Sequence, residues 1–106
     1  MNIGWEQSIL RVLAKRTLQD FWLLHPDAEE SLLAWYREAE EADWDQPAAV
    51  KAQYRSCSIL KNRRVVFNIK GNAYRLVAKI NYEHRVIYIR FVGTHSDYDA
   101  IDVDEV

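Results

Sequence analysis

The sequence is poor in the residues from which several kinds of active site are built. Its one cysteine, Cys57, cannot form an intramolecular disulfide, and no second cysteine or paired histidine stands at a metal-binding spacing. The chain also has no glycine-rich phosphate loop, no HExxH motif and no internal repeat. These absences argue against nucleotide hydrolysis and zinc chemistry. We expect a thiol kept reduced and no cofactor.

Long apolar runs are absent too. No uncharged apolar stretch approaches the roughly 20 residues that a membrane-spanning helix needs, and no signal-peptide pattern precedes the first apolar run. We therefore expect a cytoplasmic protein without a membrane partner. At 106 residues, of which 49% are apolar, the chain predicts one domain with a modest core.

Acids are scarce in one segment and bases in another. Residues 58–93 hold eight Lys and Arg against one acid, Glu83, a local charge of +7 in a chain whose net charge is −2. Residues 94–106 hold five acids and no Lys or Arg. Clustered cations attract phosphates over the Debye length whatever the net charge. A nucleic acid is therefore the first partner to consider.

Apolar and polar residues alternate in three segments of this basic region, as they do in β-strands. These segments are residues 64–70, 73–80 and 85–92. Short turns at residues 71–72 and 81–84 would join them into one antiparallel sheet. The predicted core face carries Val65, Phe67, Ile69, Tyr74, Leu76, Ala78, Ile80, Ile87, Ile89 and Phe91. The opposite face carries Arg64, Val66, Asn68, Lys70, Arg75, Val77, Lys79, Val86, Tyr88, Arg90 and Val92. A solvated sheet face normally mixes both signs of charge, so the absence of acids favours an anion-binding surface.

The first half of the chain supplies elements to cover the core face. Residues 9–14 are compatible with a further strand, and apolar residues at helical spacing then continue as far as Pro26. Asp27 and Glu30 match a capping box for a second helix, and residues 47–54 predict a third. The expected fold is α+β: a small, mostly antiparallel sheet of about four strands, with two to three helices on one face and a short C-terminal helix.

Residues directly after the last strand carry the remaining chemistry. Thr94 and Asp97 form a second capping-box pattern, which predicts a short helix. In that helix His95 and Asp99 share a face, so the pair resembles a general acid or base with its orienting carboxylate. The alternative is structural: His95 caps the helix and Tyr98 packs it against the domain.

Nine short motifs, taken together and in this order, make the chain resemble the HigB toxins. The resemblance runs from residue 10 to residue 106 and leaves residues 1–9 as an N-terminal extension to which we assign no function. The motifs are LRVLAKRTL (10–18), FW (21–22), HPDA (25–28), AWY (34–36), DW (43–44), VFNI (66–69), GNAYRL (71–76), YIRFVGTH (88–95) and YD (98–99).

The resemblance implies a RelE-like fold and a metal-independent mRNA interferase that cleaves messenger RNA, usually on a translating ribosome. It also implies silencing by a HigA-type helix-turn-helix antitoxin, with operator DNA bound only indirectly, through the antitoxin complex. A rival hypothesis is a non-catalytic module that holds RNA or the ribosome on the basic sheet without cutting it. A third is that the basic face binds an acidic protein segment.

The basic strands and the C-terminal motif together define a candidate site. Arg75 and Arg90 lie on adjacent predicted strands and are our candidates for a clamp on the scissile phosphate. His95 or Tyr98 would move the proton, with Asp99 beside them. Five further residues are predicted to contact RNA: Arg64, Asn68, Lys70, Lys79 and Tyr88.

Overall fold

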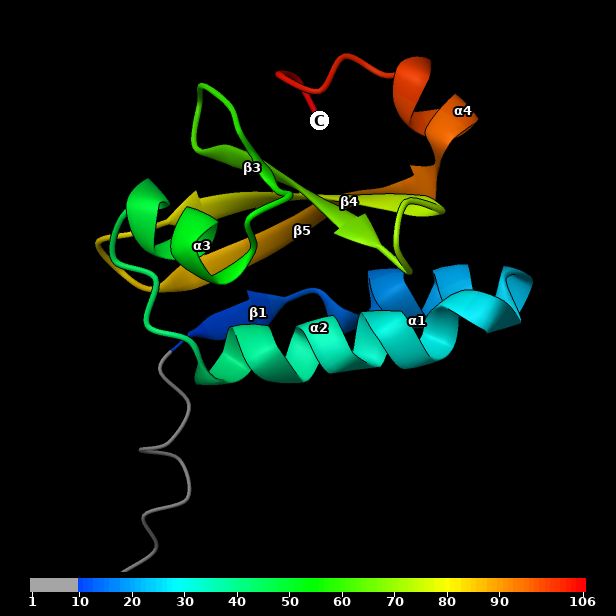
Figure 1. Ribbon diagram of the computed structural model, residues 1–106, viewed down its shortest axis with the longest axis horizontal. Helices are drawn as coiled ribbons and strands as arrows, with labels where there is room; N and C mark the ends of the chain where they lie inside the picture. The colour runs from blue at the N-terminus through cyan, green and yellow to red at the C-terminus, as the bar shows by residue number, and fades with distance from the viewer. Residues whose placement is uncertain (1–9) are drawn as a thin grey trace, which may run out of the picture.

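The computed structural model describes residues 10–106, so the expected extension at 1–9 lies outside the described residues. The fold is α+β, as predicted (Figure 1). Its elements are β1 (Arg11–Leu13), α1 (Lys15–Leu24), the 3-10 turn η2 (Pro26–Ala28), α2 (Glu29–Glu41), α3 (Pro47–Gln53), β2 (Ser58–Ile59), β3 (Arg64–Ile69), β4 (Tyr74–Asn81), β5 (Val86–Thr94) and α4 (His95–Asp99).

The strands form one sheet in the order β1-β5-β4-β3-β2. The two predicted hairpins, β3-β4 and β4-β5, are confirmed as antiparallel pairs, whereas β1 runs parallel to β5. β2 was not predicted, because its two residues lie in a stretch without visible periodicity. It extends the sheet beyond β3 and brings the chain back from α3.

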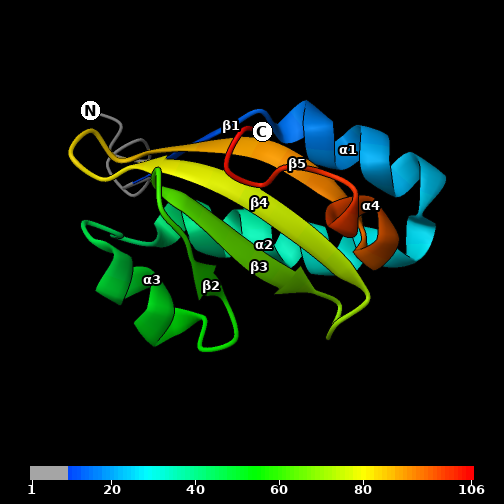
Figure 2. The same ribbon diagram turned by 90° about the horizontal axis from the view of Figure 1, so that it is seen from above.

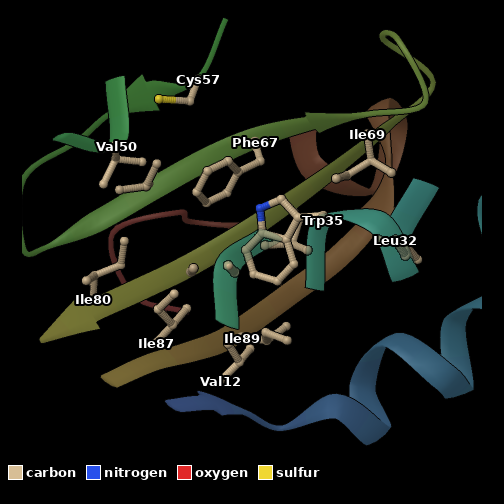
Figure 3. Packing of buried hydrophobic residues seen from close by; sticks show 14 of the residues in the cluster. Val12, Leu32, Trp35, Val50, Cys57, Phe67, Ile69, Ile80, Ile87 and Ile89 are labelled. Carbon is tan, nitrogen blue, oxygen red and sulfur yellow. The ribbon is translucent and has the colours of Figure 1, made fainter. Parts of the chain in front are cut away.

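The hydrophobic core lies between the sheet and the helices α1 and α2, which cover one face (Figure 1). Figure 3 shows Trp35 of α2 directed at the sheet, where its ring centroid lies 5.2 Å from that of Phe67. Trp44 stacks on the same phenylalanine ring at 5.8 Å. Each fully buried side chain of this size contributes about 1.5–3 kcal/mol relative to an exposed one. Among residues 10–106, no helix has the length and apolar character needed to cross a membrane.

A bulge in β5 corrects the predicted facing of its second half. β4 pairs Val77 with Phe91 but the next residue, Ala78, with Ile89, so Arg90 has no residue opposite it. An extra residue shifts the alternation by one position. Val92 therefore packs against the core, and Phe91 faces the other side of the sheet with Val77. The predictions for Phe91 and Val92 were both wrong for this reason.

Two further predictions fail where Asp27 of η2 contacts Lys70, the residue after β3. The first residue pair expected to cap α2 does not do so, since the N-cap position is Ala28 and no side chain bonds to it. Asp27 instead accepts hydrogen bonds from Tyr74 Oη at 2.7 Å and Lys70 Nζ at 2.9 Å. Lys70 follows the end of β3 with φ of 53°, so it leaves the alternation and turns toward the helices.

Candidate functional site

The sheet face opposite α1 and α2, here called the outer face, carries three rows of side chains across β3, β4 and β5. The strand register sets each row, because directly paired residues project on the same side. Arg64, Lys79 and Tyr88 form the first row; Val66, Val77 and Phe91 form the second; Asn68, Arg75 and Gly93 form the third.

The middle row separates two polar ends of the outer face. Val66 and Val77 are 4% and 0% exposed, although they do not belong to the main core. α4 and residues 100–106 lie over this side of the sheet, as both views show (Figures 1 and 2). The outer face is therefore not the open basic surface that alternation alone predicted. It has an apolar centre, with one polar site on each side.

Residues 100–106, here called the C-terminal tail, hold part of the first row. Lys61 Nζ lies 3.5 Å from an Asp104 carboxylate oxygen, and Arg64 Nη2 donates to the main-chain oxygen of Val106 at 2.5 Å. Arg64 also donates to the main-chain oxygen of Asn62 and is only 8% exposed. The prediction that Arg64 is an open cation is wrong, because the tail covers and binds it.

Helix α4 begins where β5 ends, and the predicted capping box is confirmed. The Thr94 side chain accepts from the Asp97 amide at 3.1 Å, and the Asp97 carboxylate accepts from the Thr94 amide at 3.2 Å. A Cβ at Gly93 would lie 2.9 Å from Cβ of Asp97 and 2.5 Å from the tip of the Phe91 ring. Glycine at this position thus lets α4 fold back closely on β5. Gly93 was not predicted as a site residue, although it stands directly before the capping residue Thr94.

The third row and α4 together form the first polar site. The Arg75 guanidinium lies over the Tyr98 ring, 5.9 Å from its centroid, and Phe91 borders the same ring at 6.5 Å. Arg75 also donates to Asn72 Oδ1 at 2.7 Å, a contact that the sequence argument did not anticipate. His95 opens α4, two residues after the glycine that pairs with Arg75. Arg75 and Tyr98 therefore meet at one end of the sheet, and His95 begins the helix that carries Tyr98.

Asp99 is less closely tied to this site than predicted. The structure records no hydrogen bond between Asp99 and His95, although both lie within the described residues and on α4. The one carboxylate of α4 with assigned hydrogen bonds is Asp97, which caps the helix. An orienting role for Asp99 stays a prediction.

The second polar site lies at the other end of the outer face. A cavity of about 580 Å³ opens there, lined in part by Lys79, Tyr88 and Arg90. None of these three has an ion-pair or side-chain hydrogen-bond partner among residues 10–106, and all three are exposed. In β5 the bulge places Arg90 between Ile89 and Phe91, the residues that pair with Ala78 and Val77.

Two other predicted RNA contacts are already engaged. Asn68 Nδ2 donates to the main-chain oxygen of Ser56 at 3.1 Å, which ties β3 to the segment before β2. Lys70 pairs with Asp27 on the helix side of the sheet and so is separated from the outer face. Of the five predicted RNA contacts, Lys79 and Tyr88 remain accessible on that face, without an assigned side-chain partner in the described part of the chain.

Metal and thiol chemistry find little support in the described part of the chain. No group of three or more His, Cys, Asp and Glu side chains in residues 10–106 is arranged to hold a metal ion. Cys57 is 2% exposed, and burial raises the pKa of its thiol above the ordinary value. The thiol is therefore buried and unpaired among residues 10–106.

Comparison with known proteins finds one matching protein family and several relatives. A family model described as HigB_toxin, the RelE-like toxic component of a toxin-antitoxin system, matches residues 28–101. The mRNA interferase toxin HigB of Escherichia coli K12 is 29% identical over 92 residues, which cover 85% of this chain and 88% of that protein. The mRNA interferase HigB of Shigella flexneri matches equally well, and that of Escherichia coli O6:H1 is 21% identical over 94 residues, 87% of this chain and 91% of that protein. The match to the family model includes both polar sites.

Proposed function

Because the chain belongs to the HigB toxin family, the RelE-like toxic components of toxin-antitoxin systems, we propose that it is an endoribonuclease that cleaves messenger RNA. The relatives that are named mRNA interferases support this activity. The observation that carries the proposal is the contact between Arg75 and Tyr98 at one end of the outer face, on the helix that His95 begins. We propose further that the protein acts on translating ribosomes in the cytoplasm and is silenced by a HigA-type antitoxin.

The proposed reaction uses only the RNA and these side chains. The ribose 2′-OH attacks the adjacent phosphorus, a P–O bond forms to the 2′ oxygen, and the bond to the 5′ oxygen breaks. The products are a 2′,3′-cyclic phosphate and a 5′-OH end, so a base must accept the 2′ proton and an acid must protonate the leaving oxygen. Charge develops on the equatorial phosphate oxygens, where arginine donors stabilise it most.

Arg75 and Arg90 are assigned to the phosphate. Arg75 is positioned by Asn72 on one side and by the Tyr98 ring on the other, so its fork is held in place before substrate binds. Arg90 lies in the bulge of β5. It has no assigned ion-pair or side-chain hydrogen-bond partner among residues 10–106. Two cations on one phosphate lower the cost of the additional negative charge in the transition state.

His95 and Tyr98 are assigned to proton transfer. Imidazole titrates near neutrality and serves as either acid or base, whereas a phenol donates a proton only to a strong base or a leaving alkoxide. His95→Gln keeps a hydrogen-bonding side chain that cannot titrate, and it should lower the cleavage rate by about 10²–10⁴-fold. If His95→Gln cleaves normally and Tyr98→Phe does not, the tyrosine holds the role. Full activity in both variants contradicts a catalytic α4.

The main experiment is primer extension on cellular mRNA after induced expression, with and without the candidate antitoxin. Wild-type protein should arrest growth and create new 5′ ends in translated messages. Arg75→Ala should abolish both effects while its circular dichroism and melting curve stay those of the wild type. Arg16→Ala is the matched control, since Arg16 is an exposed arginine on α1 whose one ion pair within residues 10–106 is with Asp20. Growth arrest without new 5′ ends would favour the rival hypothesis, an RNA- or ribosome-binding module.

A further inference from the structure

The cavity at the second polar site has the size and chemistry of a ligand pocket. Its volume of about 580 Å³ falls within the range of about 300–1,000 Å³ typical of small-molecule sites. Its lining residues lie around the end of β4 and the first half of β5, whereas α4 follows the other end of β5. The catalytic assignment of Arg90 accounts for one lining residue, and the assignments of Arg75, His95 and Tyr98 account for none of the others.

One wall of the cavity is an aromatic surface beside a cation. Tyr88 is 38% exposed, which is unusual for an aromatic side chain in a central part of a sheet. Lys79 is directly opposite Tyr88 on the neighbouring strand, and both line the cavity. An aromatic face next to an ammonium group suits a flat base joined to a phosphate.

Other lining residues differ in whether they are available to a ligand. Arg64 is bound by main-chain oxygens of Asn62 and Val106, and Arg63 donates to Glu83 at 2.8 Å, so these two arginines shape the walls. Asn81 Oδ1 accepts from the His84 amide, which leaves the Asn81 amide NH₂ able to donate. Amide groups of this kind hydrogen-bond the edge of a base.

We propose that this cavity binds one unpaired nucleotide of the RNA strand, with its base stacked on Tyr88, its edge within reach of Asn81 and its phosphate on Lys79. The proposal rests on the proposed function, since it assigns a second nucleotide of the same substrate. Lys79 lies four residues from Arg75 on β4 and on the same face, about 13 Å away at about 3.3 Å per residue. The nucleotide held here would therefore lie on the same strand, within a few nucleotides of the scissile phosphate. Contacts to the base of this nucleotide select the RNA sequence, whereas Arg75 binds the phosphate of any nucleotide.

The test measures binding without cleavage. The Arg75→Ala protein is titrated calorimetrically with AMP, CMP, GMP and UMP, and with ribose 5-phosphate as a probe that lacks the base. The nucleotides should bind about tenfold or more tightly than ribose 5-phosphate, because stacking supplies the difference. In the same background, Tyr88→Ala should lose about that factor, and Tyr88→Phe should retain nucleotide affinity within about twofold.

Charge is tested by a matched pair. Lys79→Ala should weaken the nucleotides and ribose 5-phosphate alike, whereas Arg37→Ala, which removes an exposed cation on α2, should weaken neither. Equal affinity for nucleotides and ribose 5-phosphate, unchanged by Tyr88→Ala, would show a simple anion site. Absence of binding by any nucleotide would refute the proposal outright.

These outcomes are separate from the proposed function. If wild-type protein cleaves mRNA but the cavity binds no nucleotide, the nuclease assignment stands and the subsite falls. If nucleotides bind through Tyr88 but no cleavage occurs in cells, the subsite stands and the catalytic assignment falls. If nucleotides bind through Tyr88 and the wild-type protein cleaves mRNA, Tyr88→Ala should change the sequence preference around the mapped cleavage positions.

Discussion

Asp27 shows how one exposed carboxylate joins three parts of the molecule. It lies in η2, between α1 and α2, and it binds both Tyr74 at the start of β4 and Lys70 just after β3. The hydrogen bond from Tyr74, followed by that from Lys70, lowers the pKa of Asp27 below its ordinary value of 3.8. The same bond to Asp27 is the main reason that the pKa of Tyr74 is raised.

Replacing Asp27 with Asn should reduce stability in a pH-dependent way. A carboxyl group whose pKa is lower in the folded state stabilises the protein at pH values above its unfolded pKa, and this contribution is lost as pH falls through the lowered folded pKa. The urea midpoint of Asp27→Asn should therefore lie below that of the wild type at pH 7, and the two should converge below about pH 4. A constant difference at all pH values would show that the ionised form is unimportant.

Residue-scale prediction from the sequence succeeded where partners are close along the chain. Thr94 and Asp97 are three residues apart and form the predicted cap. Asp27 has the same apparent pattern with Glu30, yet its partners are Lys70 and Tyr74, more than forty residues away. Local spacing cannot show which of two competing hydrogen bonds a carboxylate makes.

At the scale of elements, α4 depends on its cap more than the longer helices do. It has five residues, and isolated helices of this length do not form in water. Its capping box satisfies the amides of Thr94 and Asp97, and close packing at Gly93 holds it against β5. The positions of His95 and Tyr98 follow from these two constraints.

Removing the cap should therefore affect activity more than folding. Thr94→Ala should cost about 0.5–2 kcal/mol of helix stability. Because β5 and the core are intact, the global unfolding free energy should change little, while the cleavage rate falls as His95 and Tyr98 lose their fixed positions. Thr94→Ser keeps the capping oxygen and should remain active. Equal activity in Thr94→Ala and Thr94→Ser would show that α4 keeps its position without the side-chain cap.

Most of the elements could be predicted, because long periodic segments reveal the face that they bury. The hairpins, α1, α2, α3 and α4 are confirmed within a few residues of their expected bounds. The misses are short or irregular: the two-residue strand β2 and the bulge at Arg90. A bulge leaves no mark in the sequence, since the isoleucine, phenylalanine and valine around it are acceptable on either face of a sheet.

At the scale of the whole molecule, the local charge of +7 greatly exceeds the charge available to RNA. Arg63, Lys70 and Arg85 pair with acids elsewhere in the chain, Lys61 pairs with Asp104, and Arg64 is buried beneath the C-terminal tail. Apart from the buried Arg64, three cations of the basic segment have no acidic partner within residues 10–106, and they are Arg75, Lys79 and Arg90. Composition reveals how many charges are present but not which are already neutralised.

This count predicts the salt dependence of RNA binding. For a single-stranded, uncleavable 2′-deoxy oligonucleotide, three phosphate contacts give a slope of log K against log salt of about −2, at about −0.7 per contact. Lys79→Ala should flatten the slope by about 0.7, and Lys70→Ala should leave it unchanged because that lysine faces Asp27. A slope near −3.5, reduced by both variants, would restore the original prediction of five open cations.

Because of the bulge, Arg90 is one extra residue in β5 that the pairing of the sheet does not need. With that residue removed, Ile87, Ile89 and Val92 would occupy alternate positions on the core side, and Tyr88, Phe91 and Gly93 would alternate on the other, which is the pattern of an ordinary strand. Deletion of Arg90 should therefore yield a protein that melts at or above the wild-type temperature and cleaves no mRNA. Deletion of Ile89 is the control of equal length, because it moves the arginine into the core position and should prevent folding. If both deletions unfold the protein alike, the extra residue is part of the architecture. If only the second does, the sheet folds without the residue whose charge serves the chemistry.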